Sequence, residues 1–362
     1  MFGDARISYA IFGALFGLCF PIIATIFDVL VQGNELTWAN LVIAQRNQPL
    51  HWVIDSAPLF LGLFSYLAGR KQHEVMLINE GLEDQVKQRT LQLSEQNEEL
   101  RVIHLELQDG LERISQSINY AQRIQNAIIS DVKEMQLEFP ESAIFFKPRD
   151  VVSGDFPWFL KKGDDYYFAA VDCTGHGVPG AFMSLIGYFL LNRIVRDQGV
   201  EDTGEILCAL HLAVVNVLNQ QTNKQVHDGM DLALCKVNRI KGEIQFSGAC
   251  NPIYHISQGK LYIYNGDIWS IGGTQYKKRC PYTSKTFKFK SGDTIVMFTD
   301  GVTDQFDQSG KDKFGFKRIQ HLANAERSSD MQHLIGEVDR EITSWMGDHR
   351  QMDDMLLMAV KV

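Results

Sequence analysis

The chain has 362 residues, 45% of them hydrophobic and 22% charged, so it is long enough to hold more than one domain with a substantial core. Its formal net charge is −9, and a nucleic-acid backbone would be repelled except at a local basic patch. The composition therefore argues against general nucleic-acid binding. The six cysteines include no Cys-x-x-Cys pair and are expected to be reduced thiols.

Two apolar stretches near the N-terminus predict a membrane hairpin over residues 1–70. Ile7–Val31 is long enough to cross a bilayer, since about 20 mostly apolar residues suffice, and Leu50–Ala68 is a second, shorter candidate. Arg70 and Lys71 follow the second stretch, which favours the cytoplasm for both ends of the hairpin and leaves residues 32–49 outside as a short loop. We expect a protein of the bacterial inner (cytoplasmic) membrane with two spans and its remaining domains in the cytoplasm. A cleaved signal peptide is the alternative for the first stretch, although its apolar run is long and lacks a clear cleavage pattern.

Two carboxylates of the predicted hairpin have a possible sensing role, and two glycines have a possible packing role. Asp28 and Asp55 would lie at similar depth near the outer ends of the spans, where they could sense protons, ions or a partner, or simply contact lipid headgroups. Gly13 and Gly17 form a small-residue pattern that favours close helix packing.

Residues 71–130 predict a helical linker with coiled-coil character. One set of positions recurs every seven residues and is apolar: Leu93, Leu100, Leu107, Ile114, Ala121 and Ile128. A complementary set is more polar: Asn97, His104, Leu111, Ile118 and Gln125. Such a seam cannot bury itself alone, so we expect a parallel homodimer. The alternative is a helix that packs on the domain that follows it, at least over its last part, Ile114–Ile129.

The polar seam residues suggest a regulatory hypothesis. Asn97, His104 and Gln125 would weaken the seam locally, which can fix its register or permit a shift between two packings. Events in the membrane hairpin could then change the coil and alter the domain that follows it.

Residues 131–362 have the pattern of a mixed α/β domain with many hairpins. Strands are expected at Glu243–Ser247, Pro252–Ile256 and Lys260–Tyr264, where side chains alternate between short turns. Helices are expected at Ala181–Val195, Thr203–Gln221 and Ser328–Met346.

Four short acidic segments of this domain, called acidic corners below, each adjoin an apolar run of strand length. They are Gly154-Asp155, Asp172 to Gly177, Thr299-Asp300-Gly301 and Asp353-Asp354. Any one Asp-Gly pair is most often only a turn. Together, the corners could converge if their strands are neighbours, and oxygen-only ligands suit Mg²⁺ or Mn²⁺ rather than Zn²⁺. Two such ions can hold a bridging water acidic enough to hydrolyse phosphate esters.

The same corners lie within motifs that occur in a known order: Arg149–Phe156, Val171–Ser184, Gly229–Ala233, Phe298–Phe306 and Gln351–Met355. From about Ser117 to the C-terminus, the chain resembles the SpoIIE-type branch of the metal-dependent Ser/Thr protein phosphatases, the PPM family related to protein phosphatase 2C. The resemblance implies an α/β fold, an αββα sandwich of two antiparallel sheets flanked by helices. It also implies a site for two Mn²⁺ or Mg²⁺ ions between the sheets and phosphoserine or phosphothreonine proteins as substrates, for example an anti-sigma-factor antagonist.

The resemblance further implies a ligand set: Asp155, Asp172, the Cys173 carbonyl, Asp300, Asp353 and Asp354. Asp172 would bridge the two ions, Asp155 would serve one of them, and Asp300 and Asp353 the other. Asp354 would support its neighbour by hydrogen bonds, and the choice between Asp353 and Asp354 as the ligand stays open. Asp231 is expected to reach the site through water or a third cation.

Two further residues are candidates for catalysis. His176 is a candidate general acid, because imidazole exchanges protons near pH 7, or else it shapes its loop or lies in solvent. Arg149 is a candidate phosphate ligand, or else pairs with Asp150 or Asp155. Pro157 stands where relatives usually carry tyrosine and could reshape the first strand.

The sequence as a whole predicts a membrane-anchored, Mn/Mg-dependent protein-serine/threonine phosphatase that acts in signal transduction and is regulated through the coiled coil. Two other functions stay open: a catalytically silent membrane signalling scaffold, and a hydrolase of a small phosphate ester.

Overall fold

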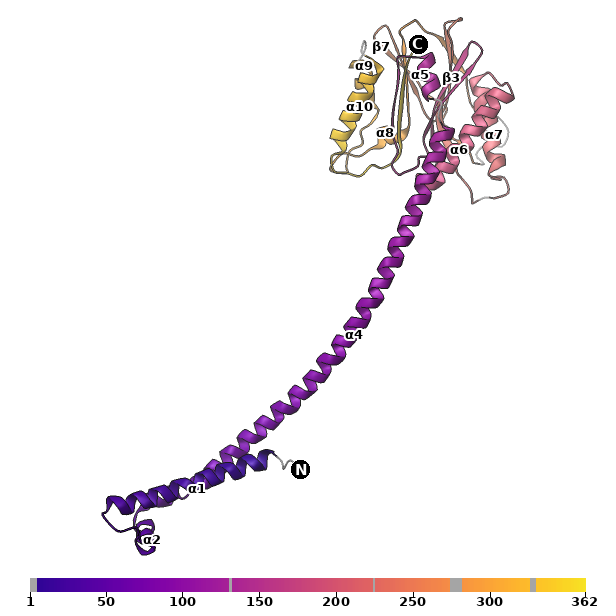
Figure 1. The fold of residues 1–362 in the computed structure, drawn as a ribbon. Coiled ribbons are helices and arrows are strands. Elements are labelled where there is room, and N and C mark those ends of the chain that lie inside the picture. Colours follow the sequence, from indigo (N-terminus) through magenta and orange to yellow (C-terminus); the bar gives the residue numbers. More distant parts are fainter. Residues whose placement is uncertain (1–4, 130–131, 224, 274–281, 326–329) are drawn as a thin grey trace. The chain divides into compact units, whose positions relative to one another are not determined.

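The computed structural model describes residues 5–129, 132–223, 225–273, 282–325 and 330–362 (Figure 1). It divides into two compact units, Met1–Asp109 and Gly110–Val362.

The first unit contains α1 (Ala5–Val31), α2 (Trp38–Asn47), α3 (Pro49–Ile54) and the first part of α4 (Ala57–Ile128). α1 packs closely on α4 through its glycines, as expected. A Cβ added to Gly13 would lie 2.1 Å from Ser65 Oγ, and one added to Gly17 would lie 2.4 Å from Pro58 Cα. Small residues at these positions are therefore required for the two backbones to approach.

Among the described residues, helical stretches long and apolar enough to cross a membrane begin at Arg6, Pro49 and Gly177. The first two overlap the predicted spans. The third belongs to the second unit, and half of the residues in its most apolar stretch are buried inside the protein.

The segment between the predicted spans differs from the expected loop, because α2 and α3 occupy much of it. These helices also supply partners for the two carboxylates of the hairpin. The buried His51 places Nε2 3.5 Å from Asp28 Oδ2, and Gln45 Nε2 donates to Asp55 Oδ2 over 2.5 Å.

α4 is a helix of 72 residues that includes most of the predicted linker. The seam leucines Leu93, Leu100 and Leu107 are each more than half exposed. Near the C-terminal end of α4, the side chain of Gln125 is buried. Ile129, just beyond the helix, packs against the core of the second unit. The alternative expected for the last part of the linker is therefore confirmed at Gln125, which lies outside any exposed seam.

The second unit is built on two antiparallel sheets. The first has the order β1 (Ser142–Lys147), β11 (Met355–Lys361), β10 (Thr294–Phe298), β6 (Ile253–Ser257) and β7 (Lys260–Tyr264). The second has the order β2 (Phe156–Lys162), β3 (Asp165–Cys173), β4 (Gly229–Asn238), β5 (Glu243–Ala249) and β9 (Lys285–Lys288), with β8 (Ile271–Gly272) paired to β4.

Helices cover the outer face of each sheet (Figure 1). α6 (Gly177–Asn192), the π-helix η1 (Arg193–Asp197) and α7 (Thr203–Val217) pack on the second sheet, whereas α9 (Phe316–Ala325) and α10 (Met331–Met346) pack on the first. The short helices α5 (Val132–Glu138) and α8 (Asp300–Asp304) complete the unit. This arrangement confirms the expected αββα sandwich.

β3 is apolar over Tyr166–Val171 because both of its faces are buried. Tyr167, Ala169 and Val171 face the core under α6 and α7, while Tyr166, Phe168 and Ala170 face the core between the sheets. A strand buried on both faces needs an almost continuous apolar sequence, because successive side chains point to opposite sides.

The expected helix limits are close to those observed. α6 begins at Gly177 rather than Ala181 and ends at Asn192 rather than Val195, where the π-helix η1 follows, and α7 ends at Val217 rather than Gln221. The predicted start of the last helix, Ser328, lies outside the described residues, and α10 begins at Met331.

Two other expectations are wrong. Pro157 does not reshape its strand: it lies within β2, opposite Ala170, on the edge of the sheet, where a residue without an N–H is tolerated. The expectation of reduced thiols fails at Cys208, which is disulfide-bonded, whereas Cys19, Cys173, Cys235 and Cys250 are free.

Candidate active site

Strand pairing brings the second and third acidic corners together. Asp172, at the end of β3, stands opposite Asp231 on β4, and the backbone N–H of Asp300 donates to Asp172 Oδ2 over 3.4 Å. Thr299 fixes the Asp300 turn, because its N–H donates to the Leu356 carbonyl and its hydroxyl accepts from the Leu356 N–H, both over 3.0 Å. These contacts join the ends of β3, β4 and β10.

The turn at Asp300 also fits directly against the fourth corner. A Cβ added to Gly301 would lie 1.9 Å from the Asp354 carbonyl oxygen, so only glycine allows this approach. Asp300 and the Asp353-Asp354 pair are thus held side by side by backbone contact.

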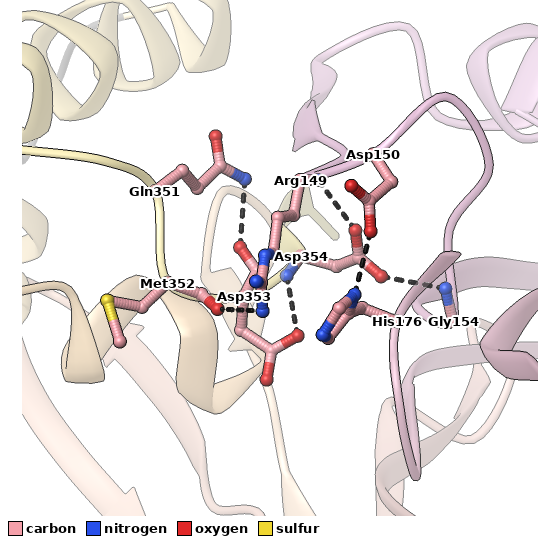
Figure 2. A network of polar contacts seen from close by, with 8 residues as sticks. All are labelled: Arg149, Asp150, Gly154, His176, Gln351, Met352, Asp353 and Asp354. Carbon is pink, nitrogen blue, oxygen red and sulfur yellow. Dashed lines mark hydrogen bonds and ion pairs between the residues drawn. The ribbon is translucent and has the colours of Figure 1, made fainter. Parts of the chain in front are cut away.

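Asp354 braces the loop that carries the first corner (Figure 2). Its carboxylate is buried and accepts two backbone hydrogen bonds of 2.7 Å, one from the Arg149 N–H to Oδ1 and one from the Gly154 N–H to Oδ2. Asp353 Oδ1 in turn accepts from the Asp354 N–H over 2.8 Å. Both oxygens of Asp354 are therefore engaged by the chain itself.

Asp155 is also deeply enclosed, with 3% of its surface exposed. Its Oδ2 is buried and has no hydrogen-bond partner among the described residues. Burial raises the pKa of Asp155 well above its ordinary value, and the charge of Asp172 raises it further. An unpartnered buried carboxylate oxygen is costly unless a cation or proton compensates it.

The pKa values of Asp172 and Asp300 are raised as well. Burial raises the pKa of Asp172 well above its ordinary value, with the charge of Asp300 as the next cause. Burial also raises the pKa of Asp300, and the charges of Asp304 and Asp353 add to the effect. Carboxylates that oppose one another's ionisation form a site that favours positive charge.

The acidic residues match divalent cations in donor type but not in their present spacing. In the described part of the chain, no three His, Cys, Asp or Glu side chains form a ready set of metal ligands. The donors are nonetheless right in kind for Mg²⁺ or Mn²⁺, since they are carboxylate oxygens, and Asp155 Oδ2 lacks a partner within the described structure. The residues therefore fit two hard cations in donor type.

Cys173 follows Asp172 and is buried. Its carbonyl oxygen lies beside Gly154, where an added Cβ would come within 3.2 Å of it. Burial raises the pKa of the thiol well above its ordinary value, followed by the charges of Asp155 and Asp172. The side chain is therefore a neutral thiol, and only the carbonyl of Cys173 is suited to a cation.

The two candidate catalytic residues have specific protein partners (Figure 2). His176 Nδ1 lies 2.7 Å from Asp150 Oδ2, and both side chains are partly exposed. The Arg149 guanidinium donates from Nη1 to the Met352 carbonyl over 2.8 Å. The expected alternative for Arg149, a pairing with Asp150 or Asp155, is not the contact that its described side chain makes.

Gln125 is a site residue that sequence analysis assigned to the linker seam. Its Nε2 donates to the Ser153 carbonyl over 2.6 Å and to Ser184 Oγ over 2.8 Å, and its Oε1 accepts from the Ser153 N–H over 3.1 Å. Ser153 Oγ accepts from the Asp155 N–H over 3.0 Å. The end of α4 is thus bonded to the loop before Asp155 and to α6. The only feature of the sequence that could have indicated this role is that Gln125 is a polar residue in a largely apolar stripe of the helix.

Asp231 has its own polar neighbours beside the acidic cluster. Burial raises its pKa, and hydrogen bonds from Ser270 and Cys250 act in the opposite direction. Cys250 Sγ lies 3.6 Å from Ser270 Oγ. The loop that carries Ser270 is therefore joined to the cluster.

Comparisons with known proteins agree with this geometry. A family model described as stage II sporulation protein E (SpoIIE) matches residues 162–362. The phosphoserine phosphatase RsbU of Bacillus subtilis is 24% identical over 267 residues, which cover 71% of this chain and 73% of RsbU. Protein IcfG of Synechocystis is 24% identical over 291 residues, covering 72% of this chain and 43% of IcfG.

Solved structures give the same result. The SiaA-PP2C domain of Pseudomonas aeruginosa superimposes with a TM-score of 0.63 at 26% identity, covering 70% of this chain and 98% of that domain. The PP2C phosphatase domain of SpoIIE from Bacillus subtilis shares the fold, with a TM-score of 0.50 at 16% identity, covering 61% of this chain and 62% of that one. Since the family model matches more than half of the residues, the chain belongs to the SpoIIE family of PP2C-type phosphatases.

Proposed function

We propose that this protein is a membrane-anchored, Mn²⁺- or Mg²⁺-dependent protein serine/threonine phosphatase of bacterial signal transduction. The observation that carries the proposal is the cluster formed by Asp155, Asp172, Asp300 and Asp353, whose charges raise the pKa values of their neighbours. Such a cluster is suited to cations that neutralise it, and phosphate-ester hydrolysis is chemistry for which such cations are used.

Asp155, Asp172, Asp300 and Asp353 would hold two divalent cations together with the Cys173 carbonyl. When bound, these cations would supply Lewis acidity and positive charge for the attack of water on phosphorus. Asp354 is the less suitable ligand of its pair, since both of its oxygens already accept backbone hydrogen bonds. Its role is to hold the Asp155 loop in place.

His176 would act as the proton donor to the departing seryl or threonyl oxygen. The Asp150 carboxylate accepts from Nδ1, which orients the ring and leaves Nε2 as the atom that exchanges a proton with the substrate. Arg149 is bonded to the Met352 carbonyl, so it would contact a phosphate oxygen only by giving up or sharing that bond.

Metal binding and turnover can be tested together. Asp172→Asn and Asp300→Asn should each weaken Mn²⁺ binding in calorimetry and abolish hydrolysis of a phosphoserine peptide. Asp164→Asn is the control, because Asp164 is exposed in the turn between β2 and β3. Unchanged Mn²⁺ binding in both site variants would contradict the proposal.

The same experiment separates the alternative functions. Hydrolysis of 4-nitrophenyl phosphate without hydrolysis of phosphoproteins would favour a small-ester hydrolase. Binding of a phosphoprotein without any turnover would favour a silent scaffold.

A phosphorylated regulatory protein is the proposed substrate. RsbU is described as a phosphoserine phosphatase, and by analogy an anti-sigma-factor antagonist is a candidate here. The proposed location is the inner membrane, with spans at Arg6–Val31 and at the apolar stretch that begins at Pro49, and with the phosphatase in the cytoplasm.

Regulation through the linker is the last part of the proposal. The exposed seam leucines of α4 would be covered in a parallel homodimer. Gln125 offers a route from that helix to the site, because it bonds to Ser153, and Ser153 in turn accepts from the Asp155 N–H. A change in the coil that moves Gln125 would therefore disturb the loop of a metal ligand.

A further inference from the structure

The loop between β7 and β8 carries two large apolar side chains on its surface. Ile268 is 81% exposed and Trp269 is 38% exposed. Single exposed apolar residues are common on folded proteins, so exposure alone assigns no role. The position of this loop and the way in which its backbone is held are more informative.

Hydrogen bonds fix the backbone on the N-terminal side of Ile268. The Asp267 N–H donates to the Gly248 carbonyl over 2.8 Å, and the Cys250 N–H donates to the Asp267 carbonyl over 2.7 Å. The Asp267 carboxylate accepts from the Thr283 N–H over 2.8 Å.

The C-terminal side of the loop is also anchored. Tyr282 donates its hydroxyl to the Ser270 carbonyl over 3.0 Å, and the following Ile271 is fully buried in β8. Ile268 therefore projects from a backbone that is already ordered. An apolar contact held in advance in this way costs little entropy when a partner binds.

The C-terminal end of the same loop lies beside the candidate active site. Ile271 pairs with Met230, the neighbour of Asp231, and Asp231 stands opposite Asp172 across the β3–β4 pair. Three residues of extended chain span at most about 10 Å, so the Ile268 backbone lies within about that distance of Ile271.

We propose that Ile268, next to Trp269 on the same loop, is a docking contact for an apolar side chain of the phosphoprotein substrate, located two or three residues from the phosphorylated serine. A reach of about 7–10 Å corresponds to two or three residues of an extended peptide. The Ile268 side chain offers neither charge nor hydrogen-bonding groups, so it would select its partner by burial of apolar surface. The inference rests on the proposed phosphatase function and adds a sequence preference to it.

The test compares two phosphoserine peptides of equal length, one with leucine and one with serine at the flanking positions. In the full-length protein, Ile268→Ser should lower kcat/KM for the leucine peptide about five- to tenfold, while hydrolysis of the serine peptide and of 4-nitrophenyl phosphate stays unchanged. Ile240→Ser is the matched control, since Ile240 is 77% exposed in the turn after β4. This control should hydrolyse all three substrates like the wild type.

A binding measurement keeps this inference separate from the phosphatase proposal. Fluorescence anisotropy with non-hydrolysable phosphonate versions of the peptides should show the same preference for leucine, and its loss in Ile268→Ser, whether or not the protein turns over substrate. Equal binding of the two peptides by the wild type would overturn the docking role. So would an equal loss in Ile240→Ser, or a change of oligomeric state confined to Ile268→Ser, which would assign the residue to a contact between copies.

Discussion

Asp150 Oδ2 lies 2.7 Å from His176 Nδ1, so a carboxylate from the loop before β2 meets the imidazole that precedes α6. The pair joins the first two of the five motifs, across 26 residues of sequence. It gives His176 a defined ring orientation at the edge of the acidic cluster, and this orientation makes the role of His176 testable.

Replacement of His176 should affect substrates according to their leaving group. His176→Ala is expected to slow hydrolysis of a phosphoserine peptide about a hundredfold, because a seryl oxygen needs a proton as it departs. Hydrolysis of 4-nitrophenyl phosphate should change much less, since nitrophenolate leaves without protonation. The measurement is kcat for both substrates under saturating Mn²⁺.

Asp150→Asn should reproduce the same selectivity at a smaller amplitude, because the side chain keeps an acceptor oxygen but loses its charge. Asp164→Asn, at an exposed turn between β2 and β3, is the control. An equal loss on both substrates in His176→Ala would argue against a proton-donor role.

Gln125→Leu should reduce both Mn²⁺ affinity and kcat about tenfold, as observed for other residues that orient metal ligands. The substitution removes the bonds to Ser153 and Ser184 without removing much volume, and it leaves a buried N–H of Ser153 unpaired. Calorimetry with Mn²⁺ and steady-state kinetics on the full-length protein provide the readouts. Gln122→Leu, one turn earlier on the same helix, should retain wild-type values.

The seam of α4 can be tested by introducing charge. Leu107→Lys should weaken the proposed parallel dimer, because it places two lysines opposite each other in the seam. Leu105→Lys is the control, since Leu105 has a similar exposed fraction but lies outside the seven-residue register. Light scattering of the detergent-solubilised protein should show a lower mass only for Leu107→Lys, and an unchanged mass would contradict the dimer model.

Without divalent cations, Asp155 should destabilise the fold as the pH rises. Its folded-state pKa is raised by burial and by Asp172, so the protonated form is favoured in the folded protein. The contribution of Asp155 to stability is therefore fully present below its unfolded pKa and is lost as the pH rises through the folded value. Thermal unfolding in EDTA should show this loss, and added Mn²⁺ should restore more stability at pH 7.5 than at pH 5.

Asp155→Asn should remove the charge of this carboxylate at every pH. Removal of an uncompensated buried charge should stabilise the metal-free protein by about 1–3 kcal/mol at pH 7.5 and abolish the additional stabilisation by Mn²⁺. Destabilisation of the metal-free protein by this variant at pH 7.5 would show that the carboxylate is compensated by some other group.

The sequence by itself determined the main elements of the catalytic fold. The doubly buried strand β3 follows from the continuous apolar run Tyr166–Val171, and β7 has the predicted limits Lys260–Tyr264, because its alternating residues lie between short turns. The acidic corners could also be predicted, since aspartates beside glycines at strand ends are visible without any contact information.

The tertiary structure alone decided which partner each polar side chain meets. Gln125 fits a coiled-coil seam by its spacing, yet it is bonded to Ser153 and Ser184, which lie 28 and 59 residues further along the chain. Asp353 and Asp354 are equivalent in the sequence, but only Asp354 accepts the N–H groups of Arg149 and Gly154. Periodicity reports which face of an element is apolar, whereas hydrogen bonds depend on the positions of distant segments, which are fixed only when the sheets pack.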